Sequence, residues 1–438
     1  MPKSGQAVSS AVHSVPTVCV GCSCLCDDIE AQLEQGRVTA VANACELGQA
    51  WFHTAADSAA SPVGKPADLA AALSQAAEIL RGARYPLVYG LEAEAAEAQR
   101  EAVALAELLG GVIDTPTSSS HAASILASQE VGKVTCTLGE VRARCDLMVL
   151  WSADPLTTHP RLFSHYTLER PGLFVPRGRA DRTLVVIDDR PTGTSALADQ
   201  FIRVRGGGDF AALWTLRALV AGRPVDAQRV LEQTGQGLEV WQPLVERLKA
   251  ARYGSLLYGS RLMAGNEGPH QVVAALALVR DLNAHTRFVG RSLRGPANSS
   301  GADQVLLWRS GYAYAVDFAR GYPRFGPGEY TASAVLERGE CDAALVVSSD
   351  PLAHLSAPAA ERLRRLPLVY LGPPHGQTWE AAEVRIPTST VGVHTGGVAY
   401  RMDEVPVALG PVQPSRLPSA AEVLRQLNQA LSFARPYP

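Results

Sequence analysis

The stretch Cys145-Asp-Leu-Met-Val-Leu-Trp-Ser-Ala-Asp154-Pro-Leu156 recurs at identical spacing as Cys341-Asp-Ala-Ala-Leu-Val-Val-Ser-Ser-Asp350-Pro-Leu352. Each copy is typical of a buried strand that ends in a Ser-x-Asp-Pro turn. In an open parallel sheet, ligands bind beyond the carboxyl ends of the strands, where such turns lie. The repeat predicts two related α/β lobes that face each other across a cleft for an elongated cofactor. For Asp154 and Asp350 themselves we expect helix N-capping, and for Cys145 and Cys341 a place in the core.

The segments around this repeat alternate between strands and helices. Pro86–Gly90 has the composition of a buried strand, and it is followed by a helical Ala/Glu-rich segment, Glu92–Leu109, and by a second strand at Gly110–Ile113. That order is a βαβ signature. Further buried strands are predicted at Leu147–Trp151, Thr183–Ile187, Ser255–Tyr258, Ala344–Val347 and Pro367–Leu371. The sequence therefore predicts a mostly parallel, doubly wound α/β architecture.

Four of the eight cysteines lie within eight residues, in Cys19-Val-Gly-Cys22-Ser-Cys24-Leu-Cys26, and Cys45 follows at a distance. Thiolates at such spacings hold a cubane iron–sulfur cluster. Zinc is the main competitor, because four sulfur ligands also suit its tetrahedral geometry. A loop that has lost its cluster is a third possibility. A disulfide framework does not explain these cysteines, because no secretory leader is recognisable and a chain of this length does not need disulfide bonds to fold stably.

Composition limits the remaining classes of function. The chain has 438 residues, of which 47% are hydrophobic and 19% charged, and this is typical of a globular protein of two or three domains. Its net charge of −3 gives no reason to expect nucleic acid or an anionic membrane as a partner. No segment approaches the roughly 20 apolar residues of a membrane span, and we expect a cytoplasmic protein. Four dispersed histidines, His159, His165, His354 and His394, show no metal-ligand spacing and are interpreted as structural or as neighbours of the cofactor.

A series of segments, in order along the chain, resembles a known family. The cysteine loop resembles the cluster domain of molybdopterin and tungstopterin oxidoreductases. Much of the rest resembles the B subunit of formylmethanofuran dehydrogenase and its counterpart in the bacterial formyltransferase/hydrolase complex. The segments that carry this resemblance include Gln129–Gly132, Cys136–Arg142, Leu150–Pro155, Val186–Thr192, Arg205–Asp209, Arg294–Gly295 and Arg320–Glu329. Together they extend from about residue 18 to residue 400.

The resemblance implies a fold and a division into domains. A cysteine-rich [4Fe-4S]-type domain is expected at residues 1–60, before two doubly wound lobes of the molybdopterin oxidoreductase type. One lobe is discontinuous, with residues 61–115 and 330–415, and the other comprises residues 116–329. A C-terminal helix and tail would occupy residues 416–438.

The resemblance also implies a function. The chain would be the B subunit of a complex that interconverts a formyl-methanofuran-type carrier with formate or CO2. We expect the formyltransferase/hydrolase form, which acts in one-carbon oxidation. The alternatives are a tungsten- or molybdenum-pterin subunit that itself reduces CO2 or oxidises formate, and an unrelated molybdopterin oxidoreductase. The implied partners are an amidohydrolase-like A subunit, a C subunit and a D subunit that carries a pterin-binding domain.

Individual residues match family positions. By resemblance, Cys19, Cys22, Cys26 and Cys45 are the cluster ligands and Cys24 is an extra thiol. Ser120 replaces the cysteine that binds the metal in the dehydrogenase, while the next residue, His121, is retained as a catalytic residue. A serine hydroxyl is a harder ligand than a thiolate and must lose its proton to bind a metal. In another register Cys136 would be the ligand, although it is more simply a buried apolar residue.

Arg294 matches the arginine that orients formate or CO2, with Arg291 as a substitute if the register shifts. A tungsto- or molybdopterin guanine dinucleotide is the implied cofactor, with Asp154, Asp188, Gly208, Asp209 and Gly396 as binding residues. Gly206–Asp209 precedes a predicted helix at Phe210–Ala221, so its amides could bind a phosphate. A plain turn with Asp209 as the N-cap explains this segment equally well.

Overall fold

The computed structural model describes residues 13–60 and 69–432. The chain forms two compact units. Unit 1 comprises Met1–Thr115, Pro296–Arg401 and Pro406–Pro438, whereas unit 2 comprises Pro116–Gly295 and Met402–Val405. Parts of the predicted domains, namely residues 1–12, residues 61–68 and the tail 433–438, lie outside the described residues.

Unit 2 is built on a five-stranded sheet in which every neighbouring pair is parallel. The spatial order is β10 (Arg287–Ser292), β9 (Tyr253–Tyr258), β6 (Leu147–Trp151), β7 (Thr183–Asp188) and β8 (Gln200–Arg203). From β6 the chain adds β7 and β8 on one side and β9 and β10 on the other. The strand order therefore reverses between β6 and β9, and ligands of doubly wound sheets bind at such a reversal.

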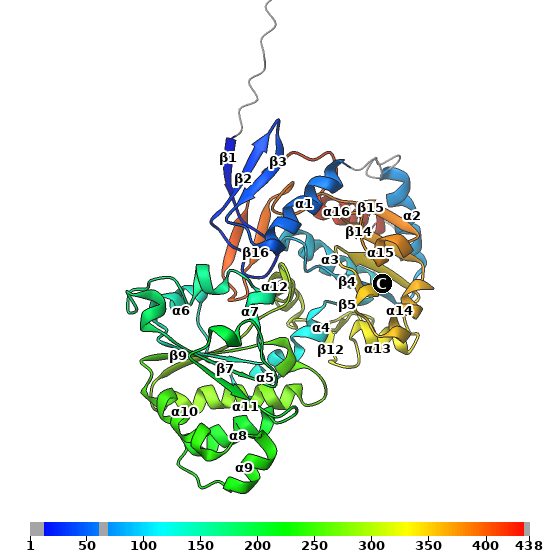
Figure 1. Cartoon of the computed structure of the whole chain (residues 1–438). Helices are drawn as coiled ribbons and strands as arrows, with labels where there is room; N and C mark the ends of the chain where they lie inside the picture. The colour runs from blue at the N-terminus through cyan, green and yellow to red at the C-terminus, as the bar shows by residue number, and fades with distance from the viewer. Residues whose placement is uncertain (1–12, 61–68, 433–438) are drawn as a thin grey trace, which may run out of the picture. The chain divides into compact units, whose positions relative to one another are not determined.

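Helices cover one face of this sheet and close its core (Figure 1). They are α5 (Ala122–Val131), α8 (Asp209–Val220), α9 (Ala227–Thr234), α10 (Leu238–Ala250) and α11 (Gly268–Leu282). The core includes the fully buried rings of Trp151, Trp241 and Phe288. Three short helices lie in the connections, α4 (Thr117–Ser120), α6 (Leu138–Arg144) and α7 (Pro155–Thr158).

Unit 1 contains a seven-stranded sheet. The order is β12 (Arg324–Phe325), β11 (Val316–Asp317), β5 (Val112–Asp114), β4 (Pro86–Gly90), β13 (Ala343–Val347), β14 (Leu368–Gly372) and β15 (Val384–Pro387). The five strands from β5 to β15 are parallel, and β11 and β12 extend the edge in antiparallel pairing. Here the strand order reverses between β4 and β13.

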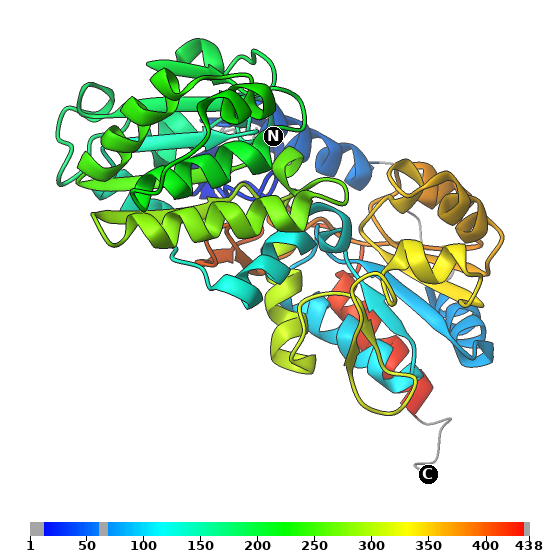
Figure 2. The same ribbon diagram turned by 90° about the horizontal axis from the view of Figure 1, so that it is seen from below.

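One face of this sheet is covered by α2 (Leu69–Gly82), α3 (Ala96–Leu109), α12 (Ser299–Ser310) and α16 (Ala420–Ser432), which share one apolar core. Figure 2 shows α16, in red, lying along α3, in cyan. Unit 1 also contains α13 (Ala332–Glu337), α14 (Ala357–Arg364) and α15 (Gln377–Ala381). Because α12 packs on α3 and β11 pairs with β5, the chain has returned to unit 1 at Pro296, before the expected boundary at residue 329.

The cysteine loop joins the first two strands of a small antiparallel sheet, β1 (His13–Thr17), β2 (Ile29–Glu34) and β3 (Arg37–Ala42), and α1 (Glu46–Ala60) follows. The loop packs into unit 1 beside the hairpin of β16 (Gly397–Tyr400) and β17 (Pro406–Leu409). Val20 and Leu25 share an apolar cluster with Val391, Ala399 and Leu409. A Cβ atom at Gly21 would lie 2.6 Å from the carbonyl oxygen of Leu47, so the loop approaches α1 too closely for a larger residue.

The two mainly parallel α/β lobes are confirmed, and β4 and β6 have the predicted bounds. The predicted helix at Glu92–Leu109 begins later, at Ala96. Leu91 has a φ of 80°, which no helix accommodates, so residues 91–95 form a loop at the end of β4. None of the helices in the described ranges is long and apolar enough to cross a membrane.

Candidate functional site

The sequence repeat is also a structural repeat. Ser152 and Ser348, which follow β6 and β13, have the same left-handed backbone, with φ values of 47° and 46°. Asp146 and Asp342, which precede these strands, each accept hydrogen bonds from two successive backbone N–H groups that lead into the neighbouring strand, β9 or β4. A positive φ in a non-glycine residue costs free energy and is concentrated at functional sites. Each unit therefore has the same strained turn at the carboxyl edge of its sheet.

The aspartates of the two Ser-x-Asp-Pro turns do not cap their own helices through their side chains. Asp154 and Asp350 occupy N-cap positions, but neither accepts a capping hydrogen bond from a backbone N–H of the helix that follows. From α7, Asp154 accepts only the side-chain hydrogen bond of the Thr157 hydroxyl, at 3.0 Å. Each carboxylate instead binds the backbone N–H and the hydroxyl of a threonine in another segment, Thr194 for Asp154 and Thr378, in the first turn of α15, for Asp350. The capping prediction is wrong in this respect, because the strained turn directs the carboxylate across the sheet edge.

A cavity of about 350 Å³ opens in unit 1, where the strand order reverses. Two glutamates from the loop after β4 line it, and each accepts a hydrogen bond from a serine after β13. Ser349 donates to Glu92 at 2.6 Å and Ser348 donates to Glu94 at 2.5 Å. The lining residues are Leu47, Ala50, Trp51, Thr54, Ala55, Glu92, Ala93, Glu94, Ser348, Ser349, Asp350, Tyr370, Pro373, His375, Ser389, Thr390 and Val391. This is where ligands bind in doubly wound sheets.

Burial controls the charge of these two glutamates. It raises the pKa of Glu92 to about 7, against the opposing effect of the hydrogen bond from Ser349. Burial likewise raises the pKa of Glu94 to about 7, and the nearby Glu92 raises it further. Both acids therefore keep their protons up to about pH 7, as expected for carboxyl groups that are removed from water.

The loop that carries the two glutamates is held rigidly by two amide side chains. Gln99 donates to the carbonyl oxygens of Leu91 and Glu94, each at 3.0 Å. Asn298 donates to the Glu94 carbonyl oxygen at 2.7 Å and accepts from the backbone N–H of Tyr400 at 2.6 Å. Loops fixed in this way position side chains for a ligand before it arrives.

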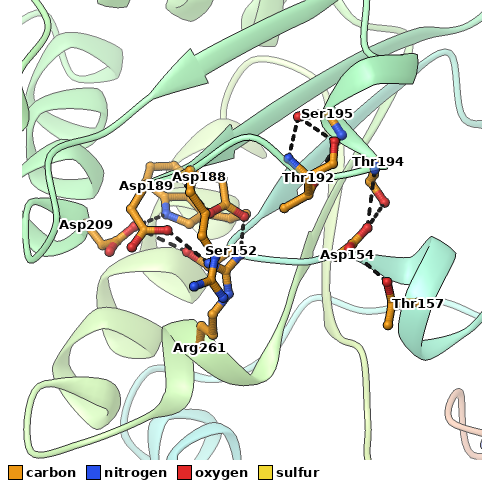
Figure 3. A network of polar contacts seen from close by, with 12 residues as sticks. Ser152, Asp154, Thr157, Asp188, Asp189, Thr192, Thr194, Ser195, Asp209 and Arg261 are labelled. Carbon is orange, nitrogen blue, oxygen red and sulfur yellow. Dashed lines mark hydrogen bonds and ion pairs between the residues drawn. The ribbon is translucent and has the colours of Figure 1, made fainter.

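The corresponding edge of unit 2 carries a polar network (Figure 3). Asp188, at the end of β7, is fully buried and pairs with Arg261, which also binds Asp189 at 2.9 Å. Asp209 accepts a hydrogen bond from Trp151 Nε1 at 2.7 Å. The structure thus brings together two predicted binding residues, Asp188 and Asp209, around a cation that sequence reasoning missed. Arg261 lies in a different loop, and no spacing in the sequence relates it to β7.

Asp209 is not the N-cap of α8. The interpretation of Gly206–Asp209 as a plain turn with Asp209 as the N-cap is therefore wrong in this respect. The cap position is Gly208, and Asp209 is the first helical residue, with its carboxylate turned toward Trp151. A Cβ atom at Gly208 would lie 2.6 Å from the carbonyl oxygen of Gln233, so close backbone approach requires this glycine. Gly396, in unit 1, approaches Leu409 in the same manner and is not among the residues that line the described cavity.

Ser120 and His121 lie at the junction of α4 and α5 in unit 2. The Ser120 hydroxyl donates to the carbonyl oxygen of Pro116 at 2.8 Å, within its own helical turn. The His121 side chain is buried, and its Nδ1 atom has no hydrogen-bond partner. Burial and the positive charges of Arg294 and Lys133 lower the pKa of His121 well below its ordinary value, so the imidazole is neutral.

The two candidate arginines differ in what they bind. The Arg291 guanidinium donates to the carbonyl oxygens of Cys136 and Met402 and to the Thr135 hydroxyl. These contacts occupy its donors in a structural role, so Arg291 is a poor candidate for orienting a substrate. The backbone carbonyl of Arg294 is bound by His159 Nε2 at 3.0 Å, and burial lowers the pKa of His159 to about 4. His159 is therefore neutral and holds the backbone of Arg294 in place.

Besides Arg291 and Arg294, this region contains a third cationic side chain, Lys133, which was not predicted from the sequence. Its ammonium lies 3.7 Å from a Glu404 carboxylate oxygen, and its side chain is only 17% exposed. Burial and the charge of Arg291 lower the pKa of Lys133 to about 8. Its position directly after the Gln129–Gly132 family segment was the available signal.

The cysteine loop is compact and mostly buried. Cys19, Cys22, Cys24 and Cys26 are buried, and Cys45 is partly exposed. A hydrogen bond with Cys22, followed by burial, raises the pKa of Cys24 well above its usual value. Within the described ranges, no three cysteine sulfur atoms lie within 4.8 Å of one another.

Fold and site together define an α/β protein of two units, each with a candidate binding region at the carboxyl edge of its mainly parallel sheet. In fold the chain is similar to acetylene hydratase from Pelobacter acetylenicus, with a TM-score of 0.69 at 11% identity over 95% of this chain and 69% of that one. It is also similar to a chain of the formyltransferase/hydrolase complex from Methylorubrum extorquens in complex with methylofuran. That match has a TM-score of 0.70 at 26% identity and covers 85% of this chain and 98% of that chain. No protein-family model matches the chain.

Sequence comparison identifies the family. The chain is 38% identical to the B subunit of tungsten-containing formylmethanofuran dehydrogenase 2 from Methanocaldococcus jannaschii, over 90% of this chain and 92% of that protein. It is 29% identical to the B subunit of the formyltransferase/hydrolase complex of Methylorubrum extorquens, over 84% of this chain and 96% of that protein. The chain belongs to the family of formylmethanofuran dehydrogenase B subunits.

Proposed function

We propose that the chain is the B subunit of a cytoplasmic complex that interconverts a formyl-methanofuran-type carrier with formate. Its partners would be an amidohydrolase-like A subunit, a C subunit and a D subunit with a pterin-binding domain. Similarity to B subunits over nine-tenths of the chain supports this assignment. A relative of known structure belongs to a complex crystallised with methylofuran, which supports a carrier of that class.

A [4Fe-4S] cluster held by Cys19, Cys22, Cys26 and Cys45 is part of the proposal. The mostly buried loop offers cysteines at the sequence spacing that such clusters require. Cys24 would be an extra thiol beside these four ligands. When bound, the cluster supplies one-electron transfer.

The strand-end edges of the two units are the proposed binding regions for a pterin dinucleotide. Unit 1 offers the cavity around Glu92 and Glu94. Unit 2 offers the network around Asp188, Asp209 and Arg261. Both lie where the strand order reverses, and the matched left-handed turns at Ser152 and Ser348 give both the same backbone framework.

The side chain at position 120 distinguishes between the two candidate reactions. Its hydroxyl is committed to the Pro116 carbonyl, and binding a metal as an alkoxide would require the loss of both the proton and that hydrogen bond. The residue present therefore fits a metal ligand poorly. We infer the formyltransferase/hydrolase form, in which formyl transfer and hydrolysis move no electrons. In this form His121 and Arg294 line a region without redox chemistry.

A second candidate is the redox-active dehydrogenase. The greater identity to the tungsten-containing dehydrogenase subunits, 38% and 36% against 29% for the hydrolase-complex protein, favours it. The retained cysteine set points in the same direction. In this case the neutral His121 would accept a proton and the Arg294 guanidinium would orient a carboxylate.

Metal analysis of the anaerobically purified complex, with its absorption spectrum, separates the two candidates. Iron without tungsten or molybdenum would support a cluster kept in a hydrolytic complex. Iron together with stoichiometric tungsten or molybdenum would make the chain a dehydrogenase subunit with an altered ligand. The absence of all three metals would overturn the cluster assignment and leave the redox fold as a scaffold.

A further inference from the structure

The tight turn at 172–175 in unit 2 exposes two large apolar side chains at its tip. The backbone N–H groups of Gly172 and Val175 donate to each other's carbonyl oxygens, at 3.1 and 3.2 Å, so that Leu173 and Phe174 form a two-residue loop. The Leu173 side chain is 79% exposed, more than any other large hydrophobic residue in the described ranges, and Phe174 is 47% exposed. Single apolar residues are common on protein surfaces, whereas adjacent ones gathered at one tip indicate a contact site.

The base of this turn is held rigidly by a buried guanidinium. Arg182 is only 4% exposed, and it donates to five backbone carbonyl oxygens at 2.5 to 3.0 Å. These carbonyl groups belong to Arg142, Cys145, Thr167, Leu168 and Arg170. In addition, the Phe174 N–H donates to the Ala143 carbonyl oxygen at 2.9 Å. A loop that is fixed before binding loses little conformational entropy when a partner binds it.

The turn lies at the amino-terminal edge of the unit 2 sheet. It bonds to the segment that leads into β6, and Arg182 directly precedes β7, which pairs with β6 in parallel. The region proposed for the pterin dinucleotide lies at the opposite, carboxyl edge of this sheet, around Asp188 and Asp209. The exposed tip is therefore not explained by that region and needs an occupant of its own.

The surface around the tip is basic. Residues 140–144 and 169–182 contain six arginines and only three acidic residues, although the whole chain has a net charge of −3. The guanidinium of Arg144 lies over the phenylalanine ring of the tip, 4.7 Å from the ring centre. Arg142 and Arg170 are exposed and pair with no carboxylate in the part of the chain that the structure describes. Aromatic side chains and arginines are the residue types that contribute most to binding at protein interfaces.

We propose that the Leu173–Phe174 tip is a docking anchor, which inserts into an apolar pocket rimmed by carboxylates on another subunit of the proposed complex. The inference rests on the proposed function, which supplies the partner subunits. Charge decides against a second copy of this chain, because a two-fold contact would bring the same arginines of both copies together. Carboxylates around the pocket of a different subunit would instead pair with Arg142 and Arg170.

The test measures how tightly the purified complex holds its subunits. The complex is diluted in about 0.1 M and in about 0.5 M salt, and the fraction of each partner subunit that stays bound to this chain is measured by sedimentation. Leu173→Ser should weaken the binding of one partner subunit at least about tenfold and leave the others unchanged, because it removes an apolar anchor. Arg142→Glu should weaken the binding of the same subunit, and by a smaller factor at the higher salt concentration, because salt screens exposed charges.

The matched control is Leu231→Ser on α9 of the same unit, where the leucine is 52% exposed. This variant should hold every subunit as wild type does. Because both leucines are exposed, the Tm of the full chain should be the same as that of wild type in both variants, so a loss of binding reports the contact and not misfolding.

Three results would overturn the inference. If Leu173→Ser holds all partner subunits as tightly as wild type, the anchor is refuted and the proposed function stands. If Leu173→Ser abolishes self-association of this chain and leaves every partner subunit bound, the occupant is a second copy and the choice of partner is wrong. If wild type itself holds no partner subunit, the proposed complex is refuted, and this inference is refuted with it.

Discussion

Replacing Glu94 by glutamine should stabilise unit 1 at alkaline pH and have no effect in acid. The Glu94 side chain is 3% exposed and accepts a hydrogen bond from Ser348, which the amide oxygen of glutamine can also accept. Burial raises its pKa from 4.5 to about 7 in the folded protein. At about 1.4 kcal/mol per pH unit, this difference corresponds to about 3 kcal/mol.

The direction of this pH effect on stability follows from the number of protons that the folded and the unfolded chain bind. As pH rises past 4.5 the unfolded chain releases the Glu94 proton, whereas the folded chain keeps it until about pH 7. Stability therefore falls between these pH values, and the full cost persists above pH 7. Glutamine has no proton to lose. The variant should be about 3 kcal/mol more stable than wild type at pH 8 and equal to it at pH 4, where both states of wild type are protonated.

Thermal unfolding of the full chain, measured at half-unit steps from pH 4 to pH 8, tests this expectation. A gain of about 3 kcal/mol corresponds to a Tm increase of about 6–12 °C for a unit of this size. Glu78→Gln, which removes the same charge from the exposed face of α2 in the same unit, supplies the baseline for removing an exposed charge. If the pH profiles of Glu94→Gln and wild type run parallel, Glu94 ionises normally in the folded chain, and the argument from burial is wrong.

Three further outcomes are expected. Cys22→Ala should abolish the brown chromophore and the bound iron of the purified complex, and an unchanged spectrum would refute the cluster. Ser120→Cys should raise the tungsten or molybdenum content if the pterin is bound, because a thiolate binds these metals better than a hydroxyl. An unchanged metal content would indicate that no metal-pterin is bound near residue 120. Arg291→Met should destabilise unit 2 by about 1–3 kcal/mol, because it leaves the buried carbonyl group of Met402 and the partly buried carbonyl group of Cys136 without their donor. A Tm equal to that of wild type would show that the Arg291 contacts contribute nothing.

Much of the fold was predictable because the parallel strands are buried on both faces and appear in the sequence as continuous apolar runs. Pro86–Gly90 and Leu147–Trp151 are such runs, and their bounds are confirmed. The repeated Ser-x-Asp-Pro turn correctly indicated two lobes with matching strand ends. Its aspartates were misinterpreted, because a carboxylate before a helix predicts capping of that helix, whereas the threonines that Asp154 and Asp350 bind lie in other segments, distant in the sequence.

The glutamates of the unit 1 cavity were missed for a specific reason. Glu92 and Glu94 stand at the start of an Ala/Glu-rich segment that is typical of an exposed helix. Only the left-handed backbone of Leu91 reveals that they belong to a strand-end loop, and nothing in an isolated leucine predicts that conformation. Their position directly after a buried strand was the signal that could have identified them. Lys133 and Arg261 were likewise recognisable only through tertiary neighbours.

The packing of the cysteine loop has a consequence for biosynthesis. Val20 and Leu25 complete their apolar cluster only with Val391, Ala399 and Leu409, more than three hundred residues later in the chain. At about 5–20 residues per second, translation needs on the order of 20–80 s to supply those residues. Unit 2 is nearly contiguous and can fold within that time. We therefore expect that the proposed cluster is inserted only after residues 391–409 have been synthesised, and that a nascent chain stalled before residue 391 exposes its cysteines to oxidation.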